Sequence, residues 1–322
     1  MHATRPECRP AQDRASLDRA EALLRAGECV ALPTETVYGL ACDATSSSAV
    51  AKVYAIKGRP SFNPLIAHVD GLERAMSLIE MSSTAQRLAE VFWPGPLTLV
   101  GRMTPNANVC DLVSAGLETL AVRWPRSKAM TALITRLDRP LAAPSANPSG
   151  AISPTRPEHV QTGLSGKVEL CLDDGPCPVG LESTIIDCTG EKMVLLRPGG
   201  TSRDAIEDVL GHGLQNAQID PNAPIAPGQL SSHYAPSARV RLDVATPKTD
   251  EGWLAFGPVG YSHSGPAFNL SEQGNLVEAA SRLFEGLHYL DARCTSIVVS
   301  PIPKTGLGEA LNDRLRRAAA PS

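Results

Sequence analysis

Two cations, a turn and a lone histidine share the stretch KGRPSFNPLIAHV, residues 57–69. Lys57 and Arg59 lie two positions apart, in the turn before an apolar run that is typical of a buried strand and contains His68. Arginine offers a planar fork that matches phosphate oxygens, and lysine offers a compact charge. Because open α/β sheets bind ligands at their strand mouths, this pair predicts a polyphosphate site rather than a solvated helix end.

Short polar clusters border several other apolar runs of the chain. PTETVYGL (33–40) and APSANPSG (143–150) follow apolar runs, GLEST (180–184) precedes one, and RPGGTS (197–202) joins one to a predicted helix. Glycines ahead of a helix N-terminus allow a phosphate to approach the backbone. Each cluster alone is compatible with an ordinary turn. Polar groups at the ends of several strands, taken together, are what a shared small-molecule pocket requires.

Several familiar catalytic and metal-binding patterns are absent from the sequence. It contains no GxxxxGK[ST] phosphate loop, no GxGxxG after the first predicted strand, no GxSxG and no HExxH. The eight cysteines include no CxxC pair, so we expect no zinc site and favour free thiols in a reducing cytoplasm. We expect Mg²⁺ to enter with a nucleotide rather than to occupy a dedicated protein site.

Composition is that of a globular protein without membrane spans. The 322 residues are 43% hydrophobic and only 4% aromatic, and the formal net charge is −4. No apolar run approaches the roughly 18 residues of a membrane span, and residues 1–20 lack the apolar core of a secretory signal. The negative charge excludes a globally basic nucleic-acid-binding protein but permits a local basic pocket.

Hydrophobic periodicity predicts alternating strands and helices over residues 10–210, typical of an α/β or mixed α+β domain. Residues 211–238 are rich in Pro, Gly, Asn, Gln and Ser and are predicted to be a linker. Residues 239–322 predict a smaller α/β domain. One helix is expected to end before Gly27, and others to span 46–58, 71–79, 83–92, 127–137, 202–210, 274–290 and 307–319. Strands are expected at 29–32, 64–69, 97–100, 119–124, 140–145, 168–172, 183–189, 193–198, 253–257 and 295–300.

Six motifs occur in the order found in a known family: PTETVYGL, KxRP…NPLxxH, AVRWP, SANxSG, GLESTI and LLRPG. Over about residues 10–210 the chain thus resembles the Sua5/YrdC family of threonylcarbamoyl-AMP synthases. The remainder resembles the additional domain of the long, two-domain Sua5 form, and HYAP (233–236) resembles its interdomain motif. The resemblance implies a large twisted open sheet with a central pocket, followed by a small Rossmann-like domain.

The resemblance also implies a nucleotidyl-transfer reaction. L-threonine, bicarbonate and ATP would give L-threonylcarbamoyladenylate and pyrophosphate. The product would serve the t6A modification of adenosine 37 in tRNA through a separate threonylcarbamoyl-transferase complex, and tRNA would be contacted only indirectly or weakly. Such chemistry depends on positioning and charge neutralisation, which agrees with the missing nucleophile motifs.

The family motifs assign residues to two subsites. Lys57 and Arg59 are the predicted catalytic residues, because they would stabilise charge on the nucleotide phosphates. The L-threonine site would comprise Thr36, His68, Arg123, Ser145 and Ser183. The ATP site would comprise Lys57, Arg59, Asn63, Thr119, Asn147, Ser153, Thr155, Arg197 and Tyr234, with the choice between Ser153 and Thr155 open. Since Tyr234 lies in the predicted linker, we hypothesise that the linker folds over the pocket as a lid.

Three other interpretations stay open on the sequence alone. A carbamoyl-AMP-forming relative of hydrogenase-maturation modules would carry an acylphosphatase domain and Cys-rich zinc fingers, which this sequence lacks. An RNA-binding relative would dock RNA on a basic face, which the net charge disfavours. A non-catalytic relative would bind only a nucleotide, and the full set of hydroxyl and cationic positions argues against it.

Overall fold

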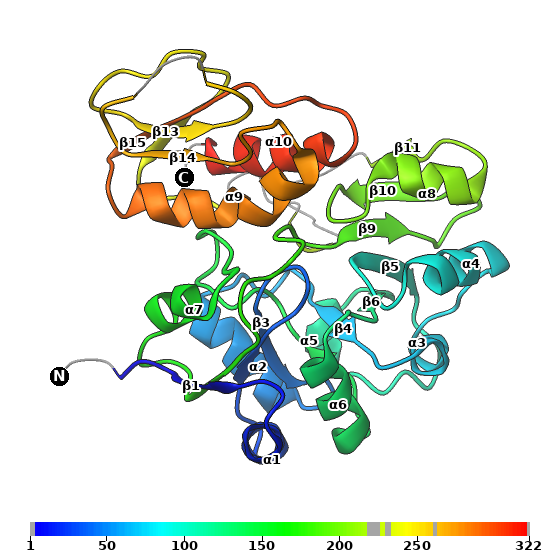
Figure 1. Cartoon of the computed structure of the whole chain (residues 1–322). Helices are drawn as coiled ribbons and strands as arrows, with labels where there is room; N and C mark the ends of the chain where they lie inside the picture. Colours follow the sequence, from blue (N-terminus) through cyan, green and yellow to red (C-terminus); the bar gives the residue numbers. More distant parts are fainter. Residues whose placement is uncertain (1–3, 218–225, 229–232, 260–262, 321–322) are drawn as a thin grey trace.

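Two β-sheets organise the chain (Figure 1). The structure, a computed structural model, describes residues 4–217, 226–228, 233–259 and 263–320. Within these residues the larger sheet has the order β1-β8-β2-β3-β7-β4-β6-β5-β9-β10-β11. Its strands are β1 (Glu7–Pro10), β2 (Val30–Leu32), β3 (Gly39–Asp43), β4 (Ile66–His68), β5 (Leu97–Arg102), β6 (Thr119–Arg123), β7 (Leu141–Ala142), β8 (Leu170–Asp173), β9 (Thr184–Asp187), β10 (Val194–Arg197) and β11 (Gln215–Asn216).

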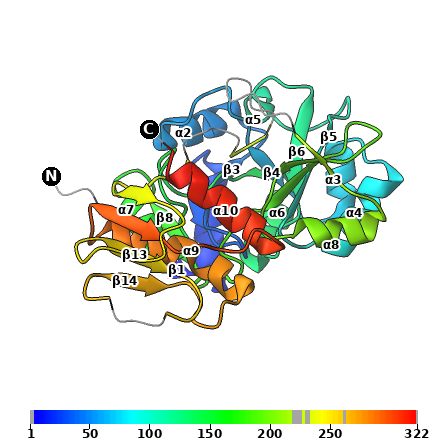
Figure 2. The same cartoon turned by 90° about the horizontal axis from the view of Figure 1, so that it is seen from above.

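The smaller sheet has the order β12-β15-β13-β14, and all its strand pairs are parallel. Its strands are β12 (Arg239–Arg241), β13 (Gly252–Ala255), β14 (Ala267–Asn269) and β15 (Ser296–Val299). Helices α9 (Leu276–Asp291) and α10 (Leu307–Ala318) pack side by side between this sheet and the larger unit (Figures 1 and 2). Parallel strands with covering helices are a Rossmann-like arrangement, and the two sheets confirm the predicted fold class.

Serine caps define where several helices of the larger unit begin. The hydroxyls of Ser46, Ser82, Ser127 and Ser202 each accept a backbone N–H from the first turn of a helix. The second helix ends at Gly58, whose φ of 60° turns the chain toward the predicted phosphate site. The helices are α1 (Arg14–Arg25), α2 (Ser47–Lys57), α3 (Leu72–Leu78), α4 (Ser83–Phe92), α5 (Asp111–Ser114), α6 (Lys128–Leu137), α7 (Pro157–Gly163) and α8 (Arg203–Leu210). None of the helices in the described ranges is long and apolar enough to cross a bilayer.

Long amphipathic helices are predicted well, and short elements are not. The expected bounds of α2, α3, α4, α6, α8, α9 and α10 agree with the structure to within two residues. The sequence does not predict the helices α5 and α7 or the strands β1, β3, β11, β12 and β14, because most of them have only two to five residues, which carry little periodicity. The strand expected at 140–145 is only β7, since Pro144 interrupts the pairing.

The two units share a continuous interface. Val37, Ile152 and Leu181 of the larger unit cluster with apolar residues of α9 and α10. At Gly180 (φ +70°) an added Cβ would lie 2.5 Å from the Cα of Ser281, so the backbones of the two units meet there. Parts of the predicted linker, 218–225 and 229–232, lie outside the described residues.

Candidate active site

One pocket collects most of the predicted site residues. It opens where β4, β6, β10 and the start of β9 meet the loop after β7 and the described part of the linker. In the parallel pair β4–β6, His68 lies opposite Arg123, so the sheet register places these two side chains together. Eight predicted residues line the pocket: Thr36, Arg59, His68, Arg123, Ser145, Ser183, Arg197 and Tyr234.

Arg59 is fixed by the turn that its own motif forms. Its Nε donates to the carbonyl of Asn63 at 3.1 Å, and its Nη2 donates to Asn63 Oδ1 at 2.7 Å and to the Pro64 carbonyl at 2.8 Å. Burial lowers the pKa of Arg59 to about 10, which leaves the guanidinium charged at neutral pH. A buried, rigid cation of this kind suits a phosphate oxygen.

Lys57 holds two loops together beside the pocket. Its Nζ donates to the carbonyls of Ser145 and Asn147, at 2.5 and 2.6 Å. Burial, helped by the nearby charge of Arg59, lowers the pKa of Lys57 well below its usual value. The ammonium is thus engaged with the SANPSG loop, and it contacts a pocket residue without lining the pocket itself.

Arg197 joins three parts of the site. Its Nε and Nη2 donate to the Ser183 carbonyl, at 3.1 and 2.8 Å, and its Nη1 donates to the carbonyl of Pro227 in the linker at 3.2 Å. Together with Arg59 and Arg123, Arg197 brings the number of arginines in the pocket lining to three, against one glutamate, Glu182. This excess of positive charge favours an anionic ligand.

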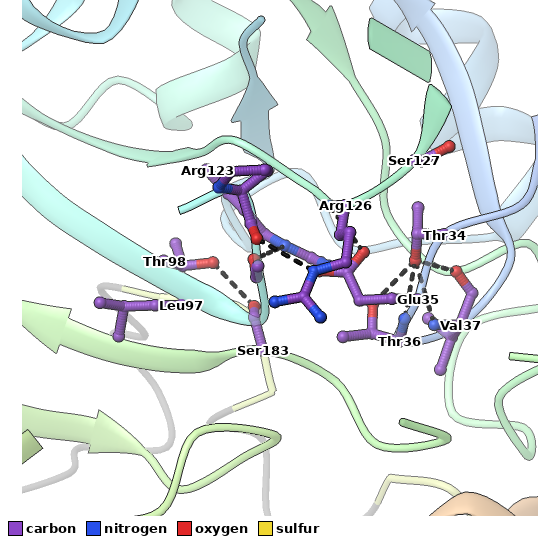
Figure 3. A network of polar contacts seen from close by, with 12 residues as sticks. Thr34, Glu35, Thr36, Val37, Leu97, Thr98, Arg123, Arg126, Ser127 and Ser183 are labelled. Carbon is purple, nitrogen blue, oxygen red and sulfur yellow. Dashed lines mark hydrogen bonds and ion pairs between the residues drawn. The ribbon is translucent and has the colours of Figure 1, made fainter. Parts of the chain in front are cut away.

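The other end of the pocket combines an ion pair with a neutral imidazole. Arg123 Nη2 lies 2.8 Å from Glu35 Oε1, and Arg123 Nε donates to the Gly95 carbonyl at 3.1 Å. Glu35 Oε2 accepts the backbone N–H of Arg126 at 3.0 Å (Figure 3). Burial, with the neighbouring charge of Arg123, lowers the pKa of His68 to about 3, so this ring is uncharged at pH 7.

Hydroxyl groups surround the same end. Thr34 Oγ1 and Thr36 Oγ1 are 2.8 Å apart, and Thr98 Oγ1 and Ser183 Oγ are 2.7 Å apart (Figure 3). These pairs hold the hydroxyls of Thr36 and Ser183 in place, so that each can exchange hydrogen bonds with a small polar ligand.

Unpaired polar atoms mark where a ligand would bind. Among the described residues, His68 Nδ1 and His233 Nδ1 of the pocket lining, and Asn63 Nδ2 and Asn147 Oδ1 beside it, are buried without a hydrogen-bond partner. Arg123 Nη2 and Glu35 Oε1 are not counted with these atoms, because they form an ion pair at 2.8 Å. Buried polar atoms without a partner are rare in native proteins, and four around one pocket indicate a polar ligand.

The remaining predicted residues lie behind or away from the lining. The Ser153 hydroxyl donates to Glu182 Oε1 at 2.6 Å, which places it one contact from the pocket. The buried Thr155 Oγ1 has no hydrogen-bond partner among the described residues. Thr119 begins β6, whereas Arg123 ends it, so the two lie about 13 Å apart along the strand.

Three charged residues at the site, Glu35, Glu182 and Arg314, have no role predicted from the sequence. Glu35 lies in the motif PTETVYGL and Glu182 in the motif GLEST. Glu182 forms an ion pair with Arg314 of α10 at 2.7 Å. Burial alone would raise the pKa of Glu182, but the charges of Arg314 and Arg197 lower it below its usual value. The available signal for Arg314 was its place between Leu311 and Leu315 on the apolar stripe of a helix.

No group of three or more His, Cys, Asp or Glu side chains with metal-binding geometry occurs in the part of the chain that the structure describes. Glu35 and Glu182, the carboxylates of the site, are each paired with an arginine. All eight cysteines are free thiols; four are buried and four are partly exposed.

Comparisons with known proteins agree with this geometry. Residues 22–199 match the Sua5/YciO/YrdC family model, described as "Telomere recombination". Residues 201–320 match a model described as "Threonylcarbamoyl-AMP synthase, C-terminal domain". Both halves of the chain are thus covered by models of one family.

Two similar relatives are named threonylcarbamoyl-AMP synthase. That of Bacillus subtilis is 37% identical, covering 94% of this chain and 92% of the relative. That of Pyrococcus abyssi is 38% identical, covering 93% of each. Coverage of 92% or more on both sides excludes a match to an isolated domain.

Solved structures show the same fold. P. abyssi Sua5 complexed with L-threonine superposes with a TM-score of 0.87 at 36% identity, covering 94% of each chain. E. coli YciO shares the fold of the larger unit, with a TM-score of 0.54 at 21% identity over 62% of this chain. Sequence motifs, family models and fold agree, and the chain belongs to the Sua5/YrdC family in its two-domain Sua5 form.

Proposed function

We propose that this protein is an L-threonylcarbamoyladenylate synthase, a nucleotidyltransferase that forms threonylcarbamoyl-AMP and pyrophosphate from L-threonine, bicarbonate and ATP. The observation that carries the proposal is the cationic pocket with four unpaired buried polar atoms. The P. abyssi relative that superposes on the chain binds L-threonine.

The amino acid would occupy the end formed by Arg123 and His68. Arg123, anchored by Glu35 and Gly95, would bind the carboxylate of threonine. The uncharged His68, with the hydroxyls of Thr36, Ser145 and Ser183, would bind the remaining polar groups. Threonine would react through its amino group with bicarbonate to give a carbamate and water.

The nucleotide would occupy the end formed by the buried cations. One carbamate oxygen would attack the α-phosphorus of ATP, the bond to the β-phosphate oxygen would break, and pyrophosphate would leave. Arg59 and Arg197 would neutralise the phosphates directly, while Lys57 would hold the SANPSG loop in place. The other ATP contacts would come from Asn63, Thr119, Asn147, Ser153 or Thr155, and Tyr234.

Mg²⁺ would enter with ATP, with no protein residue assigned to hold it, and would neutralise part of the phosphate charge. The ion-paired state of Glu35 and Glu182 supports this route, since neither carboxylate is available as a simple metal ligand.

Tyr234 would form part of a lid. It is 1% exposed, and the side chains around it leave about 60 Å³ of free space. Ligand sites usually offer roughly 300–1,000 Å³, so ATP can enter only if the segment carrying Tyr234 moves outward. Closure would then shield the carbamoyl intermediate from water.

In this proposal residues 10–210 form the catalytic domain, 211–238 the linker that serves as the lid, and 239–322 the C-terminal domain. A separate transferase complex would pass the threonylcarbamoyl group to adenosine 37 of tRNA, so tRNA would bind this protein weakly or indirectly. The free thiols suit a reducing cytoplasm, where tRNA is modified.

A pyrophosphate-release assay tests the proposal, with the product identified by mass spectrometry. Release should require threonine and bicarbonate and should be weak with serine. Release that is independent of threonine would overturn the proposal. Salt-dependent tRNA binding without threonine-dependent release would favour the RNA-binding alternative, and release with carbamoyl phosphate would favour the hydrogenase-maturation type.

A further inference from the structure

Arg314 is a fully buried arginine that the C-terminal unit inserts into the interface with the larger unit. Its side chain is 0% exposed. Its Nε donates to Glu182 Oε2 at 2.7 Å, and its Nη1 donates to Asp313 Oδ2 at 2.6 Å. Burying a charge is costly unless it is paired, so the position of this guanidinium is set by these two carboxylates.

Arg314 also contacts Tyr234. Its Cζ lies 5.2 Å from the centroid of the Tyr234 ring, within the range of a cation–π interaction. The ring of Phe284 in α9 packs against the same tyrosine, with centroids 5.5 Å apart. Tyr234 has a φ of +61°, a backbone conformation that an aromatic residue adopts only when its surroundings hold it there.

Of the three residues that Arg314 contacts, Glu182 and Tyr234 line the pocket, whereas Asp313 and Arg314 itself do not. Glu182 and Tyr234 are among the lining residues, which in the described part of the chain include none from α9 or α10. Glu182 precedes Ser183, and an added Cβ at Gly228 would lie 3.1 Å from the Tyr234 hydroxyl and 3.0 Å from Arg197 Nη1. The tyrosine hydroxyl therefore reaches the cationic end of the site.

We propose that Arg314 is a positioning residue, by which the C-terminal domain fixes Glu182 and Tyr234 at the pocket and holds the Tyr234 segment closed. The inference rests on the proposed function and deepens it, since it gives the C-terminal domain a role in the reaction beyond carrying the linker. Arg314 acts through its two partners and touches no substrate.

The decisive variant is Arg314→Lys in the full chain, because lysine keeps the charge but loses the fork and the flat face that meets Tyr234. Arg314→Met would remove the ion-pair partner of the buried Glu182 and threatens folding, whereas Asp313 would keep its pair with Arg317. Glu309→Gln is the matched control. It breaks the 2.9 Å ion pair between Arg203 and Glu309, which also joins α10 to the larger unit but contacts neither Glu182 nor Tyr234.

Arg314→Lys should raise the ATP KM about tenfold and lower the product formed per ATP consumed, as expected from loss of a desolvated cation–π contact. Glu309→Gln should leave both quantities near wild type. In the double variant Arg314→Lys/Tyr234→Ala the combined effect should be smaller than the sum of the two single effects, because both changes remove the contact between Arg314 and Tyr234.

A folded Arg314→Lys protein with wild-type ATP KM and wild-type yield per ATP would overturn the inference, and so would additive effects in the double variant. ATP binding measured by calorimetry gives the same comparison without turnover. A wild-type protein that binds ATP but shows no threonine-dependent pyrophosphate release would instead overturn the proposed function.

Discussion

Arg123 Nη2 lies 2.8 Å from Glu35 Oε1, and the two side chains are 5% and 4% exposed. The pair joins the PTETVYGL motif to the AVRWP motif across 88 positions of sequence. Glu35 also accepts the backbone N–H of Arg126, so it fixes the strand end from which Arg123 reaches the pocket.

Glu35→Gln should therefore impair threonine binding. Arg123 would lose its buried counter-charge, and we expect the threonine KM to rise about tenfold and the free energy of unfolding to fall by about 3 kcal/mol. Steady-state kinetics and urea denaturation measure the two effects. Glu118→Gln, which alters an exposed pair with Arg102, is the control and should change neither. An unchanged threonine KM in Glu35→Gln would show that Arg123 needs no such support.

His68→Ala should separate the two subsites. The variant should lose about tenfold in threonine affinity and keep its ATP affinity, because His68 lies beside Arg123 at the end of the pocket proposed for the amino acid. Calorimetric titrations with threonine and with a non-hydrolysable ATP analogue provide the measurement, with the exposed His212→Ala as control. Loss of ATP affinity alone would mean that the subsites are assigned the wrong way round.

Arg59→Lys should weaken ATP binding and leave threonine binding unchanged. Lysine keeps the charge but cannot reproduce the three hydrogen bonds to Asn63 and Pro64, so the phosphate-binding group loses its fixed orientation. We expect the ATP KM to rise about tenfold at an unchanged threonine KM. The exposed Arg102→Lys serves as the control, and equal effects on both substrates would argue against a phosphate role.

Tyr234→Ala should uncouple ATP consumption from product. Without the ring, water reaches the carbamoyl intermediate, and the threonylcarbamoyl-AMP formed per ATP consumed should fall severalfold. Pyrophosphate release and product are measured in the same reaction. Tyr234→Phe, which keeps the ring, should retain most of the coupling. Unchanged coupling and unchanged ATP affinity in Tyr234→Ala would contradict the lid.

Stability should fall as the pH drops below about 6.5. Burial lowers the pKa values of His68 and His159 to about 3, while both rings titrate near 6.5 in the unfolded chain. Between these pH values the unfolded state binds more protons, so each ring removes up to about 1.4 kcal/mol per pH unit. The urea concentration at the unfolding midpoint, measured at pH 7.0 and at pH 5.5, tests this loss of stability. His159→Asn should weaken the dependence of the midpoint on pH, and the control His212→Asn should not. Equal midpoints of the wild-type protein at the two pH values would contradict the prediction.

The sequence by itself determined most of the longer helices and eight of the residues that line the pocket. Serine caps, the Gly58 stop and apolar periodicity are local signals, and they fix the bounds of helices such as α4 and α6. The motifs also gave the residues that line the pocket, because each motif is a short polar segment at a strand end.

Only the tertiary structure decided how these residues work together. The pairs Glu35–Arg123 and Glu182–Arg314 and the bonds from Lys57 to the SANPSG loop join segments 88, 132 and about 90 positions apart. Local propensity carries no signal for such contacts, since a charged residue that pairs across the fold looks the same in sequence as one that faces water. Burial creates the difference: once water is removed, each charge must find its partner, and the fold determines which partner that is.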